Sequence, residues 1–356
     1  MSNIYAVVLA GGKGERFWPK SRENKPKQLL GLISKNSMLQ ETLDRVEPLT
    51  SRERQWVVTS ADLIEPIKQS GIKDVRLIGE PLGRNTAPAI AVAAAEIFKE
   101  DPSGVMMVLP SDHHIGDLEM FRQVLLQGVE LAEKDYLVTI GLKPDRPETG
   151  YGYIERGEVL PDCRIPCFKV KSFREKPDME TARRFYRSGY FYWNGGIFIW
   201  KAAAILQSFK QHMPKLYWQL MEWQAQGGLA AGPEKFAEFY QAVEKISIDY
   251  GIMEKADKVA VIKGEFGWDD LGSWEALERF HPRDDRGNIK LGQVEMLDCQ
   301  DNIVLCDEGL VAAVGVSDLI IVKSGNAVMV CPRSQAQEVR KLLEQVRANK
   351  DLKEYL

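Results

Sequence analysis

Cysteine is scarce in this sequence, and none of its five cysteines forms a C-x-x-C pair. An odd number at irregular spacing is not the pattern of a disulfide-stapled secreted domain or of a structural zinc site. We therefore expect a reduced protein without a zinc centre. The five cysteines are Cys163, Cys167, Cys299, Cys306 and Cys331.

Long apolar runs and an excess of positive charge are also missing. No run approaches the ~20 apolar residues that a membrane-spanning helix needs, and the N-terminus lacks the cationic region and cleavage site of a signal peptide. The 47 Lys and Arg residues are outnumbered by 51 Asp and Glu residues, which gives a formal net charge of −4 at pH 7. A nucleic-acid-binding protein would need a basic face. The composition thus predicts a cytoplasmic protein that binds neither membranes nor nucleic acid.

A glycine-rich segment is present directly after the first predicted strand, residues 4–8. Gly11, Gly12 and Gly14 allow the backbone to approach a ligand closely and to adopt positive φ, so that backbone N–H groups can converge on phosphate oxygens. An ordinary tight turn is the alternative for such a segment taken by itself. The position after a strand favours a phosphate-binding loop.

Positive charges follow these glycines. Arg16 and Lys27 would supply the full charges that backbone dipoles lack, although a solvated surface lysine is the alternative for Lys27. No Gly-Lys-Ser/Thr sequence closes the segment as in a P-loop, and Phe17 stands in place of the third glycine of a dinucleotide-binding fingerprint. The segment therefore predicts a polyphosphate-binding loop of a different kind.

Predicted strands alternate with predicted helices up to residue 141, which is the pattern of an α/β fold with a parallel sheet covered on both faces. Hairpin-like segments at 152–159 and 167–173 follow, and then a mostly helical region at 202–242. We interpret these as an insertion into one α/β domain. The candidate strands of the first part are residues 5–9, 55–59, 75–78, 105–109 and 137–141, and its candidate helices are residues 38–46 and 89–99.

The pattern changes after Gly287. Apolar triplets recur about eight residues apart with turn residues between them, which predicts a small β-roll or β-sandwich. These triplets need a partner surface, so we expect the tail to pack on the rest of the chain or on a second subunit. A final helix fits residues 335–347. The triplets are residues 303–305, 310–312, 319–321 and 327–329.

The glycine-rich segment is one of a larger set of motifs. Gly-Gly-x-Gly-x-Arg at 11–16, followed by Pro-Lys-Gln at 26–28, resembles the signature of the sugar-1-phosphate nucleotidyltransferases. Glu-Pro-Leu-Gly-Arg-Asn-Thr-Ala-Pro-Ala-Ile at 80–90 is similar to a segment of the mannose-1-phosphate guanylyltransferases, also called GDP-mannose pyrophosphorylases. The motifs follow the family's order along the chain. The other matching segments are residues 110–113, 148–154, 173–177, 193–196, 247–249 and 267–274.

The resemblance implies an α/β architecture in two parts. A Rossmann-like mixed sheet would form the nucleotidyltransferase domain at residues 1–280. A small C-terminal β-roll or left-handed β-helix with a terminal helix would follow at residues 281–356. The length of 356 residues agrees with one large and one small domain.

The resemblance also implies a reaction. Members of the family transfer GMP from GTP to α-D-mannose 1-phosphate, giving GDP-mannose and pyrophosphate, by Mg²⁺-assisted in-line attack of the sugar phosphate. Such a transfer depends on positioning and on neutralising phosphate charge. It needs no general base, because the sugar phosphate already carries its nucleophilic oxygen.

Four residues form the expected catalytic group. Asp112 and Asp270 match the family's metal positions, and two carboxylates with phosphate oxygens and water suit the octahedral coordination of Mg²⁺. By the same resemblance, Arg16 would bridge the β- and γ-phosphates and Lys27 would lie near the α-phosphate. For Asp269 we expect a loop or helix-cap role instead.

The base and the sugar have their own candidate residues. Guanine presents N–H donors, so a carboxylate is a natural acceptor, and the nucleotide-binding candidates beside the loop glycines are Glu80, Arg84, Asn85 and Thr86. Which of them contacts guanine stays open, and a helix N-cap is the alternative for Thr86. The sugar-phosphate candidates implied by the family are Gly152, Glu175, Lys176, Asn194 and Asp249.

Several alternatives stay open. An exposed charged turn is the competing interpretation of Glu175 and Lys176. Another hexose 1-phosphate or another nucleotide would fit the same superfamily, and a regulatory paralogue could bind a nucleotide sugar without turnover. A dehydrogenase is disfavoured by Phe17. For the protein as a whole we expect GTP and mannose 1-phosphate as ligands, Mg²⁺ as cofactor and a homodimeric assembly.

Overall fold

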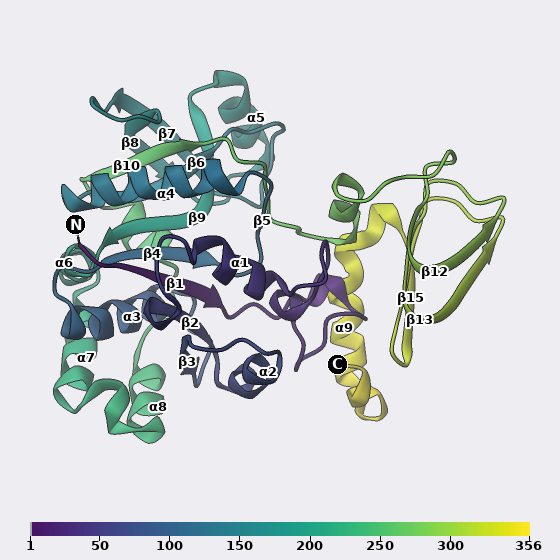
Figure 1. The fold of residues 1–356 in the computed structure, drawn as a ribbon, viewed down its shortest axis with the longest axis horizontal. Coiled ribbons are helices and arrows are strands. Elements are labelled where there is room, and N and C mark those ends of the chain that lie inside the picture. Colours follow the sequence, from purple (N-terminus) through teal and green to yellow (C-terminus); the bar gives the residue numbers. More distant parts are fainter. Residues whose placement is uncertain (1) are drawn as a thin grey trace. The chain divides into compact units, whose positions relative to one another are not determined.

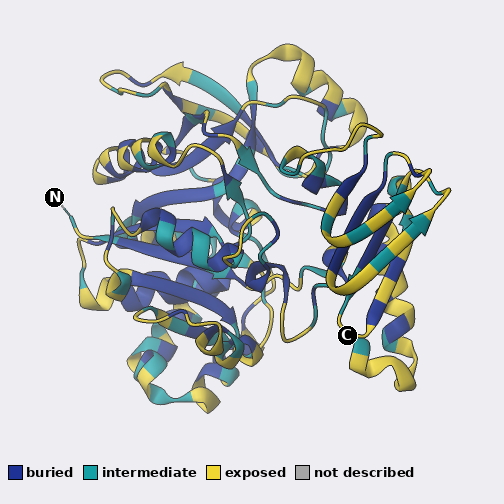
Figure 2. Cartoon of the chain, turned by 45° about the vertical axis from the view of Figure 1, so that its right-hand side comes forward, coloured by how far each residue is buried: buried dark blue, intermediate teal, exposed yellow. Residues whose placement is uncertain are grey.

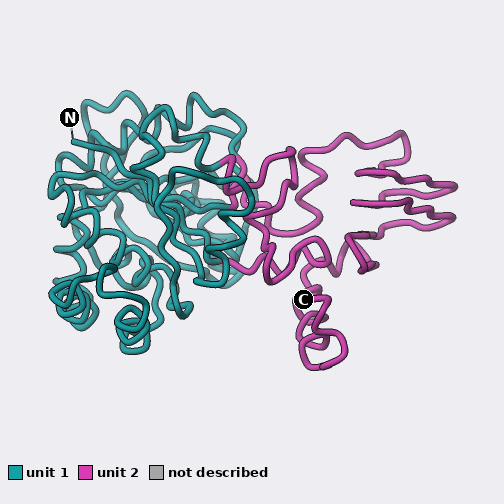
Figure 3. The backbone as a smooth tube through the Cα atoms, turned by 60° about the horizontal axis from the view of Figure 1, so that its bottom comes forward, with its two compact units in different colours: residues 1–11, 42–111, 115–268 teal, residues 12–41, 112–114, 269–356 magenta. Residues whose placement is uncertain are grey.

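The structure is a computed structural model that describes residues 2–356. It contains two compact units, each built from several segments (Figure 3). The sheet unit holds the residues up to 11, residues 42–111 and residues 115–268, and the pocket unit holds residues 12–41, 112–114 and 269–356. The domain boundary that we expect between residues 280 and 281 falls inside the pocket unit, which includes residues 269–356. The division into domains 1–280 and 281–356 therefore stays a prediction about the sequence.

The sheet unit is built on a nine-stranded sheet in the order β3-β2-β1-β4-β9-β6-β10-β8-β7. The first four of these strands are parallel, as the alternating pattern predicts. β9 is antiparallel to both β4 and β6, so the complete sheet is mixed. The strands are β1 (Ile4–Ala10), β2 (Gln55–Ser60), β3 (Arg76–Glu80), β4 (Val105–Pro110), β6 (Leu137–Leu142), β7 (Tyr153–Val159), β8 (Cys167–Arg174), β9 (Phe191–Lys201) and β10 (Val259–Gly264).

Helices cover both faces of this sheet (Figure 1). α3, α6, α7 and α8 contribute to one buried cluster, and α4 contributes to the other. The helices of this part of the chain are α1 (Met38–Val46), α2 (Ile64–Gln69), α3 (Thr86–Glu100), α4 (Leu118–Glu133), α5 (Met179–Ser188), α6 (Ala202–His212), α7 (Pro214–Ala225) and α8 (Pro233–Ala242), with a π-helical turn at Asp249–Met253. Two-residue strands β5 (His114–Ile115) and β11 (Trp268–Asp269) lie where the chain passes between the units.

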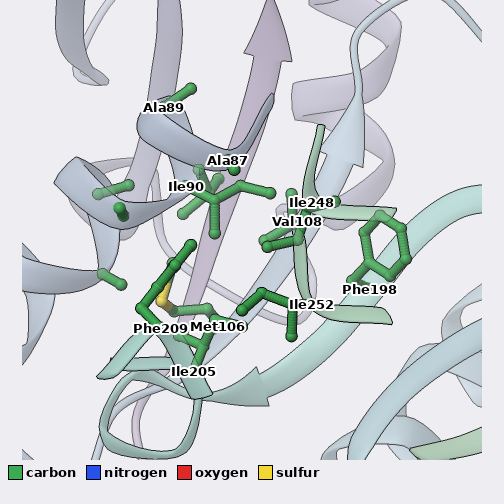
Figure 4. Packing of buried hydrophobic residues seen from close by; sticks show 14 of the residues in the cluster. Ala87, Ala89, Ile90, Met106, Val108, Phe198, Ile205, Phe209, Ile248 and Ile252 are labelled. Carbon is green, nitrogen blue, oxygen red and sulfur yellow. The ribbon is translucent and has the colours of Figure 1, made fainter. Parts of the chain in front are cut away.

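The alternation of side chains along each strand explains why the sheet has two buried clusters, one on each face. In β4, Met106 and Val108 belong to one cluster while Met107 and Leu109 belong to the other, because successive side chains of a strand point to opposite faces. α3 is buried over much of its length, and its many alanines let neighbouring elements approach closely. Ile90 of α3 lies among Met106, Val108 and Phe209 in the first cluster (Figure 4). The strands at the centre of the sheet are accordingly buried on both sides (Figure 2).

The pocket unit contains a four-stranded sheet in the order β12-β13-β14-β15. β12 (Ile289–Leu297), β13 (Ile303–Val314) and β14 (Leu319–Ser324) are parallel neighbours, whereas β15 (Ala327–Pro332) is antiparallel to β14. Ile289, Ile303 and Ile320 are paired across the three parallel strands and are buried. Such stacked rows of side chains are typical of parallel β-helices. The tail then ends in a 3-10 helix at Arg333–Glu338, α9 (Val339–Ala348) and a last 3-10 helix at Lys350–Tyr355.

The tail differs from expectation in its strands and agrees with it in having a partner surface. The triplets at 303–305 and 310–312 lie in one strand, β13, and not in two. β13 bulges between Cys306, which pairs with Gly292, and Val311, which pairs with Val294, and it then continues its pairing with β12. The expected partner surface is found within the chain. The buried cluster of the pocket unit joins Phe17, Trp18 and Leu30 to Val322 and to Leu343 of α9.

Over residues 2–356, no helix combines the length and apolarity that crossing a membrane requires.

Candidate functional site

A pocket of about 560 Å³ lies in the pocket unit and collects the four expected catalytic residues. The glycine-rich segment, the 3-10 helix Lys27–Leu29, the residues after β4 and the loop at 270–272 supply its walls. Four cations and three carboxylates line it, which suits a polyphosphate accompanied by a metal ion. These charged residues are Lys13, Arg16, Lys27 and Arg340, and Glu15, Asp112 and Asp270.

The glycine-rich loop packs directly against Lys27. Gly14 has a φ of 62°, and a Cβ atom there would lie 2.3 Å from the Lys27 Cβ and 2.5 Å from the Lys27 backbone N. Gly14 is therefore required both for its backbone conformation and for the close approach. Positive φ was expected of all three loop glycines, but Gly11 and Gly12 do not adopt it.

Lys27 connects the carboxylate of Asp112 to the backbone of Asp270. Its Nζ donates to Oδ2 of Asp112 at 2.8 Å and to the backbone carbonyl of Asp270 at 2.6 Å. The Lys27 side chain is only 8% exposed, whereas that of Asp112 is 38% exposed and so remains accessible to a ligand. The surface-lysine alternative for Lys27 is therefore wrong.

The charges of this pocket hold Asp112 in its ionised form. Burial by itself would raise the pKa of the Asp112 carboxyl. The positive charges of Lys27 and His113 and the hydrogen bond from Lys27 outweigh that effect and keep the pKa below its usual value. An ionised carboxylate is the form that binds a divalent cation.

The loop at 270–272 is fixed by Asp269. The Asp269 carboxylate accepts from the Leu271 backbone N–H at 2.8 Å and pairs with the Arg279 guanidinium. Leu271 is buried and has a φ of 45°, a conformation that bulky side chains rarely adopt. Arg16 donates to the Gly272 carbonyl at 3.4 Å. Asp269 thus has the structural loop role that we expected, and Asp270 lines the pocket together with Arg16.

Mg²⁺ fits the donor set of this pocket. It is bound in proteins through one or two carboxylates together with substrate phosphates and water, and Asp112 and Asp270 offer that number of carboxylates. Within residues 2–356 no group of three or more His, Cys, Asp or Glu side chains gathers as a ready-made metal cage. A site that needs the substrate's phosphates to complete it agrees with both observations.

Glu80 is one of the nucleotide-binding candidates, and it lies in the sheet unit. It ends β3, and its Oε1 accepts from the Tyr240 hydroxyl at 3.1 Å. A Cβ atom on Gly11 would lie 3.7 Å from the other oxygen, Oε2, so the start of the glycine-rich segment runs past Glu80. Burial raises the pKa of Glu80 to about 7, although the Tyr240 hydrogen bond opposes the shift.

The other three candidates of this segment hold the loop together. Arg84 donates from Nε to the Tyr240 carbonyl at 2.8 Å and from Nη2 to the Gln241 carbonyl at 3.1 Å. Asn85, with a φ of 67°, caps α3 by accepting from the Thr86 N–H. Thr86 is the first helical residue, and its hydroxyl accepts from the Ile248 N–H at 2.9 Å. The helix cap that we considered for Thr86 is therefore supplied by Asn85.

Three of the sugar-phosphate candidates meet at Gly152 in the sheet unit. A Cβ atom on Gly152 would lie 2.3 Å from Oε2 of Glu175 and 3.3 Å from Cβ of Asn194. The Asn194 backbone N–H also donates to the Gly152 carbonyl at 2.8 Å. Gly152 therefore leaves room for the Glu175 carboxylate, which is the physical reason for a glycine at this point.

Asn194 and Asp249 form a hydrogen-bonded pair. Asn194 Nδ2 donates to Oδ1 of Asp249 at 2.9 Å, while its Oδ1 accepts from the Gly196 N–H and the Thr139 hydroxyl. The side-chain oxygen of Asn194 is thus already satisfied, and its second amide N–H is what it can offer a ligand. Burial raises the pKa of Asp249, with the hydrogen bond from Asn194 acting in the opposite direction.

Glu175 and Lys176 differ in their surroundings. The Glu175 side chain is 11% exposed, and burial followed by the negative charge of Asp249 raises the pKa of its carboxyl. Lys176 has a φ of 44°, and its Nζ lies 3.4 Å from Oε1 of Glu175 with most of the side chain exposed. An exposed turn therefore does not describe Glu175, whereas the Lys176 ammonium is exposed and its role stays a prediction.

Sequence reasoning missed three residues, one in the sheet unit and two in the pocket unit. Tyr240 contacts Glu80 from α8, and Glu15 and Arg340 line the pocket of the pocket unit. Glu15 lies within the glycine-rich motif, where its charge was visible but its role was not. Tyr240 and Arg340 are far along the chain from their partners Glu80 and Glu15, and only the folded structure brings each of them to its partner.

Comparisons with known proteins agree with this geometry. A family model described as nucleotidyl transferase matches residues 5–286, and one described as MannoseP isomerase/GMP-like beta-helix domain matches residues 292–346. The second match confirms the expected β-helix-like character of the tail, and together with the mixed sheet it confirms the expected fold class.

Related chains extend the match over nearly the whole length. A mannose-1-phosphate guanylyltransferase of Klebsiella pneumoniae is 37% identical over 353 residues, which cover 97% of this chain and 74% of the relative. One of Escherichia coli strain K12 is 36% identical, with 98% and 74% covered. A crystal structure from Thermus thermophilus, named mannose-1-phosphate geranyltransferase, matches with a TM-score of 0.87 and 39% identity over 97% of this chain and 99% of that one. The chain belongs to the mannose-1-phosphate guanylyltransferase family of nucleotidyl transferases.

Proposed function

We propose that this chain transfers GMP from GTP to α-D-mannose 1-phosphate and releases pyrophosphate and GDP-mannose. The observation that carries the proposal is the Lys27 ammonium, held between Asp112 and the Asp270 backbone in a pocket that Arg16 also lines. A fixed cation beside cation-binding carboxylates suits charge stabilisation at a phosphorus centre. Family relatives that are named for this activity support the choice of substrates.

The reaction forms one bond and breaks one. An oxygen of the sugar phosphate attacks the α-phosphorus of GTP, and the bond from that phosphorus to the β-phosphate oxygen breaks, so that pyrophosphate leaves with the bonding electrons. The attacking oxygen is already anionic and no residue has to remove a proton. Lys27 would neutralise charge at the α-phosphate, and Arg16 would neutralise charge on the departing pyrophosphate.

Asp112 and Asp270 would hold Mg²⁺, which would supply charge neutralisation and orientation of the phosphate oxygens. The lowered pKa of Asp112 supports this role, because the carboxylate is ionised at neutral pH. The backbones of Gly11, Gly12 and Gly14 would contribute N–H groups to the phosphates.

Base and sugar selection are assigned to the sheet unit. Glu80 would accept from the N–H donors of guanine, with Arg84, Asn85 and Thr86 holding the segment that carries it. Glu175 and Asn194 would contact hydroxyl groups of the hexose in the space that Gly152 leaves open, Asp249 would orient Asn194, and Lys176 would bind the sugar phosphate. We also propose domains at 1–280 and 281–356, a cytoplasmic location and a homodimer.

A substrate panel tests the proposed function. Pyrophosphate release would be measured for GTP, ITP, ATP and dTTP, each with the 1-phosphates of mannose, glucose and galactose, at fixed magnesium. We expect GTP with mannose 1-phosphate to give the highest kcat/KM. ITP lacks the N2 amine and should lose about 5- to 150-fold, because one polar group at the site is left unpaired. Equal efficiency with dTTP, or no turnover with any pair, would contradict the proposal.

A further inference from the structure

The C-terminal helix α9 supplies a cation to the phosphate pocket. Arg340 lies in the first turn of α9 and lines the same pocket as Arg16, Lys27, Asp112 and Asp270. No motif of the sequence includes Arg340, and the segment after residue 287 contributes no other residue to this pocket's lining as far as residues 2–356 are concerned.

Arg340 is held at the pocket by the glycine-rich loop. Its Nε lies 3.3 Å from Oε2 of Glu15, and Arg347, two turns further along α9, places Nη2 2.6 Å from Oε1 of the same carboxylate. Glu15 is largely buried, with 17% of its side chain exposed, whereas Arg340 is 65% exposed. Two guanidinium groups thus share the Glu15 carboxylate, and Nε of Arg347 also lies 4.0 Å from Oε1 of Glu23.

The geometry of the guanidinium leaves donors for a ligand. Nε lies at ion-pair distance from Glu15, and in the part of the chain that the structure describes Glu15 is the one ionic partner of Arg340. The Nη groups can therefore form the paired N–H contacts that arginine makes with phosphate. The backbone below is rigid, because Val339, Leu343 and Val346 of α9 are buried.

We propose that Arg340 binds the pyrophosphate portion of the nucleoside triphosphate and the pyrophosphate product, so that the C-terminal helix is part of the substrate site. Glu15 acts as a positioning residue that aims Arg340, and Arg347 fixes Glu15. The identity of the anion rests on the proposed function, whereas the placement of Arg340 in a cationic pocket does not.

The test measures pyrophosphate binding and turnover in the full-length protein. Inorganic pyrophosphate with magnesium is titrated calorimetrically into the wild type and into Arg340→Ala, and the KM for pyrophosphate and for GDP-mannose is measured in the reverse reaction. We expect Arg340→Ala to weaken pyrophosphate binding by about 10- to 100-fold and to raise the pyrophosphate KM equally, while the GDP-mannose KM changes by less than about twofold. The pyrophosphate affinity of Arg340→Lys should lie between those of the wild type and Arg340→Ala. Lysine keeps the positive charge but lacks the paired N–H groups of the guanidinium.

Lys341→Ala is the matched control. Lys341 is the next residue of α9, its side chain is 73% exposed, and it pairs with Glu338 at 2.6 Å. The same charge is removed from the same helix, so an equal loss in Lys341→Ala would show a general charge effect and overturn the proposal. An unchanged pyrophosphate affinity in a folded Arg340→Ala protein would overturn it as well.

Arg347→Ala separates ligand binding from loop support. If Arg340 acted only by holding Glu15, Arg347→Ala would weaken pyrophosphate binding at least as much, and that result would overturn the proposal.

Binding and turnover also separate this inference from the proposed function. A wild type that binds pyrophosphate but transfers no nucleotide would contradict the proposed function alone, whereas normal turnover with unchanged binding in Arg340→Ala would contradict the inference alone.

Discussion

Individual charges dominate the pocket that Arg16, Lys27, Asp112 and Asp270 line. Lys27 is almost fully buried and is paired with Asp112, so removing either partner leaves an uncompensated charge in partly buried surroundings. The same pair brings a fixed positive charge next to a carboxylate that is free to bind a second cation. Substitutions in this pocket should therefore affect rate more than substrate selection.

The metal assignment predicts a large loss of rate in two variants. Asp112→Asn and Asp270→Asn each remove a charged ligand at constant size, and each should lower kcat by at least ~100-fold, or ~2.7 kcal/mol of transition-state stabilisation. Steady-state kinetics over a magnesium series would measure this, with circular dichroism to check folding. Asp285→Asn, an exposed aspartate outside this pocket, is the control and should retain its rate. Near-normal rates for both pocket variants at saturating magnesium would rule the assignment out.

The raised pKa of Glu80 predicts a pH dependence of ligand binding. With a pKa of about 7 the carboxyl is protonated below neutrality, where it no longer offers a charged acceptor to guanine. The affinity for GDP-mannose should rise about tenfold per pH unit as the pH approaches 7 from below, and should then level off. Tyr240 stays neutral over this range because burial and the adjacent Glu80 charge raise its pKa well above 10.

The stability effect of Glu80 has the opposite direction. A carboxyl whose pKa is higher in the folded than in the unfolded state stabilises the fold at pH values below about 4.5, and this contribution is lost as the pH rises through about 7. Glu80→Gln should remove this step from a plot of urea midpoint against pH, and it should also flatten the pH dependence of GDP-mannose binding. Identical pH profiles for wild type and Glu80→Gln would show that another group titrates.

At the scale of elements, α9 couples the tail to the glycine-rich segment. Its apolar face joins the cluster that contains Phe17 and Trp18, which follow Arg16 directly in the chain. Its polar face holds Glu15. The helix thus supports the glycine-rich segment through both packing and charge.

Two adjacent leucines of α9 provide a matched test of this support. Leu343 is 3% exposed within the cluster, whereas Leu342 is 41% exposed. Leu343→Ala should destabilise the protein by about 2–5 kcal/mol because it leaves a cavity, while Leu342→Ala should change stability by less than ~0.5 kcal/mol. Urea unfolding would measure both. Equal effects of the two substitutions would mean that α9 is not packed as the structure has it.

At the scale of the whole molecule, we expect two copies of the chain to associate. Leu297 of β12 and Val314 of β13 are paired neighbours and are 61% and 68% exposed, and Leu310 of β13 is 57% exposed. Exposed apolar side chains that cluster on one sheet are typical of interaction surfaces. Light scattering should give about twice the chain mass of 40.3 kDa, and Leu297→Asp with Val314→Asp should give the single mass. A wild type of single mass at micromolar concentration would contradict a homodimer.

The sequence alone predicted much of the local structure. The bounds of α1 are those expected, and β1, β2, β3, β4 and β6 lie within about two residues of their predicted positions, because apolar runs bounded by turn residues report burial directly. The position of β9 could not be predicted in the same way. It inserts antiparallel between β4 and β6, and the partner of a strand depends on the whole sheet and not on the strand's own pattern.

The candidate site likewise has features that could be predicted from the sequence and features that could not. Arg16, Lys27, Asp112 and Asp270 carry motif chemistry that was visible in the chain, and the structure brings them to one pocket. The sequence determined which residues can bind phosphate and metal, since charge and backbone freedom belong to the residue itself. Only the tertiary structure decided that Glu80 is held by Tyr240 and Glu15 by Arg340, because burial and long-range contacts arise only when distant segments pack together.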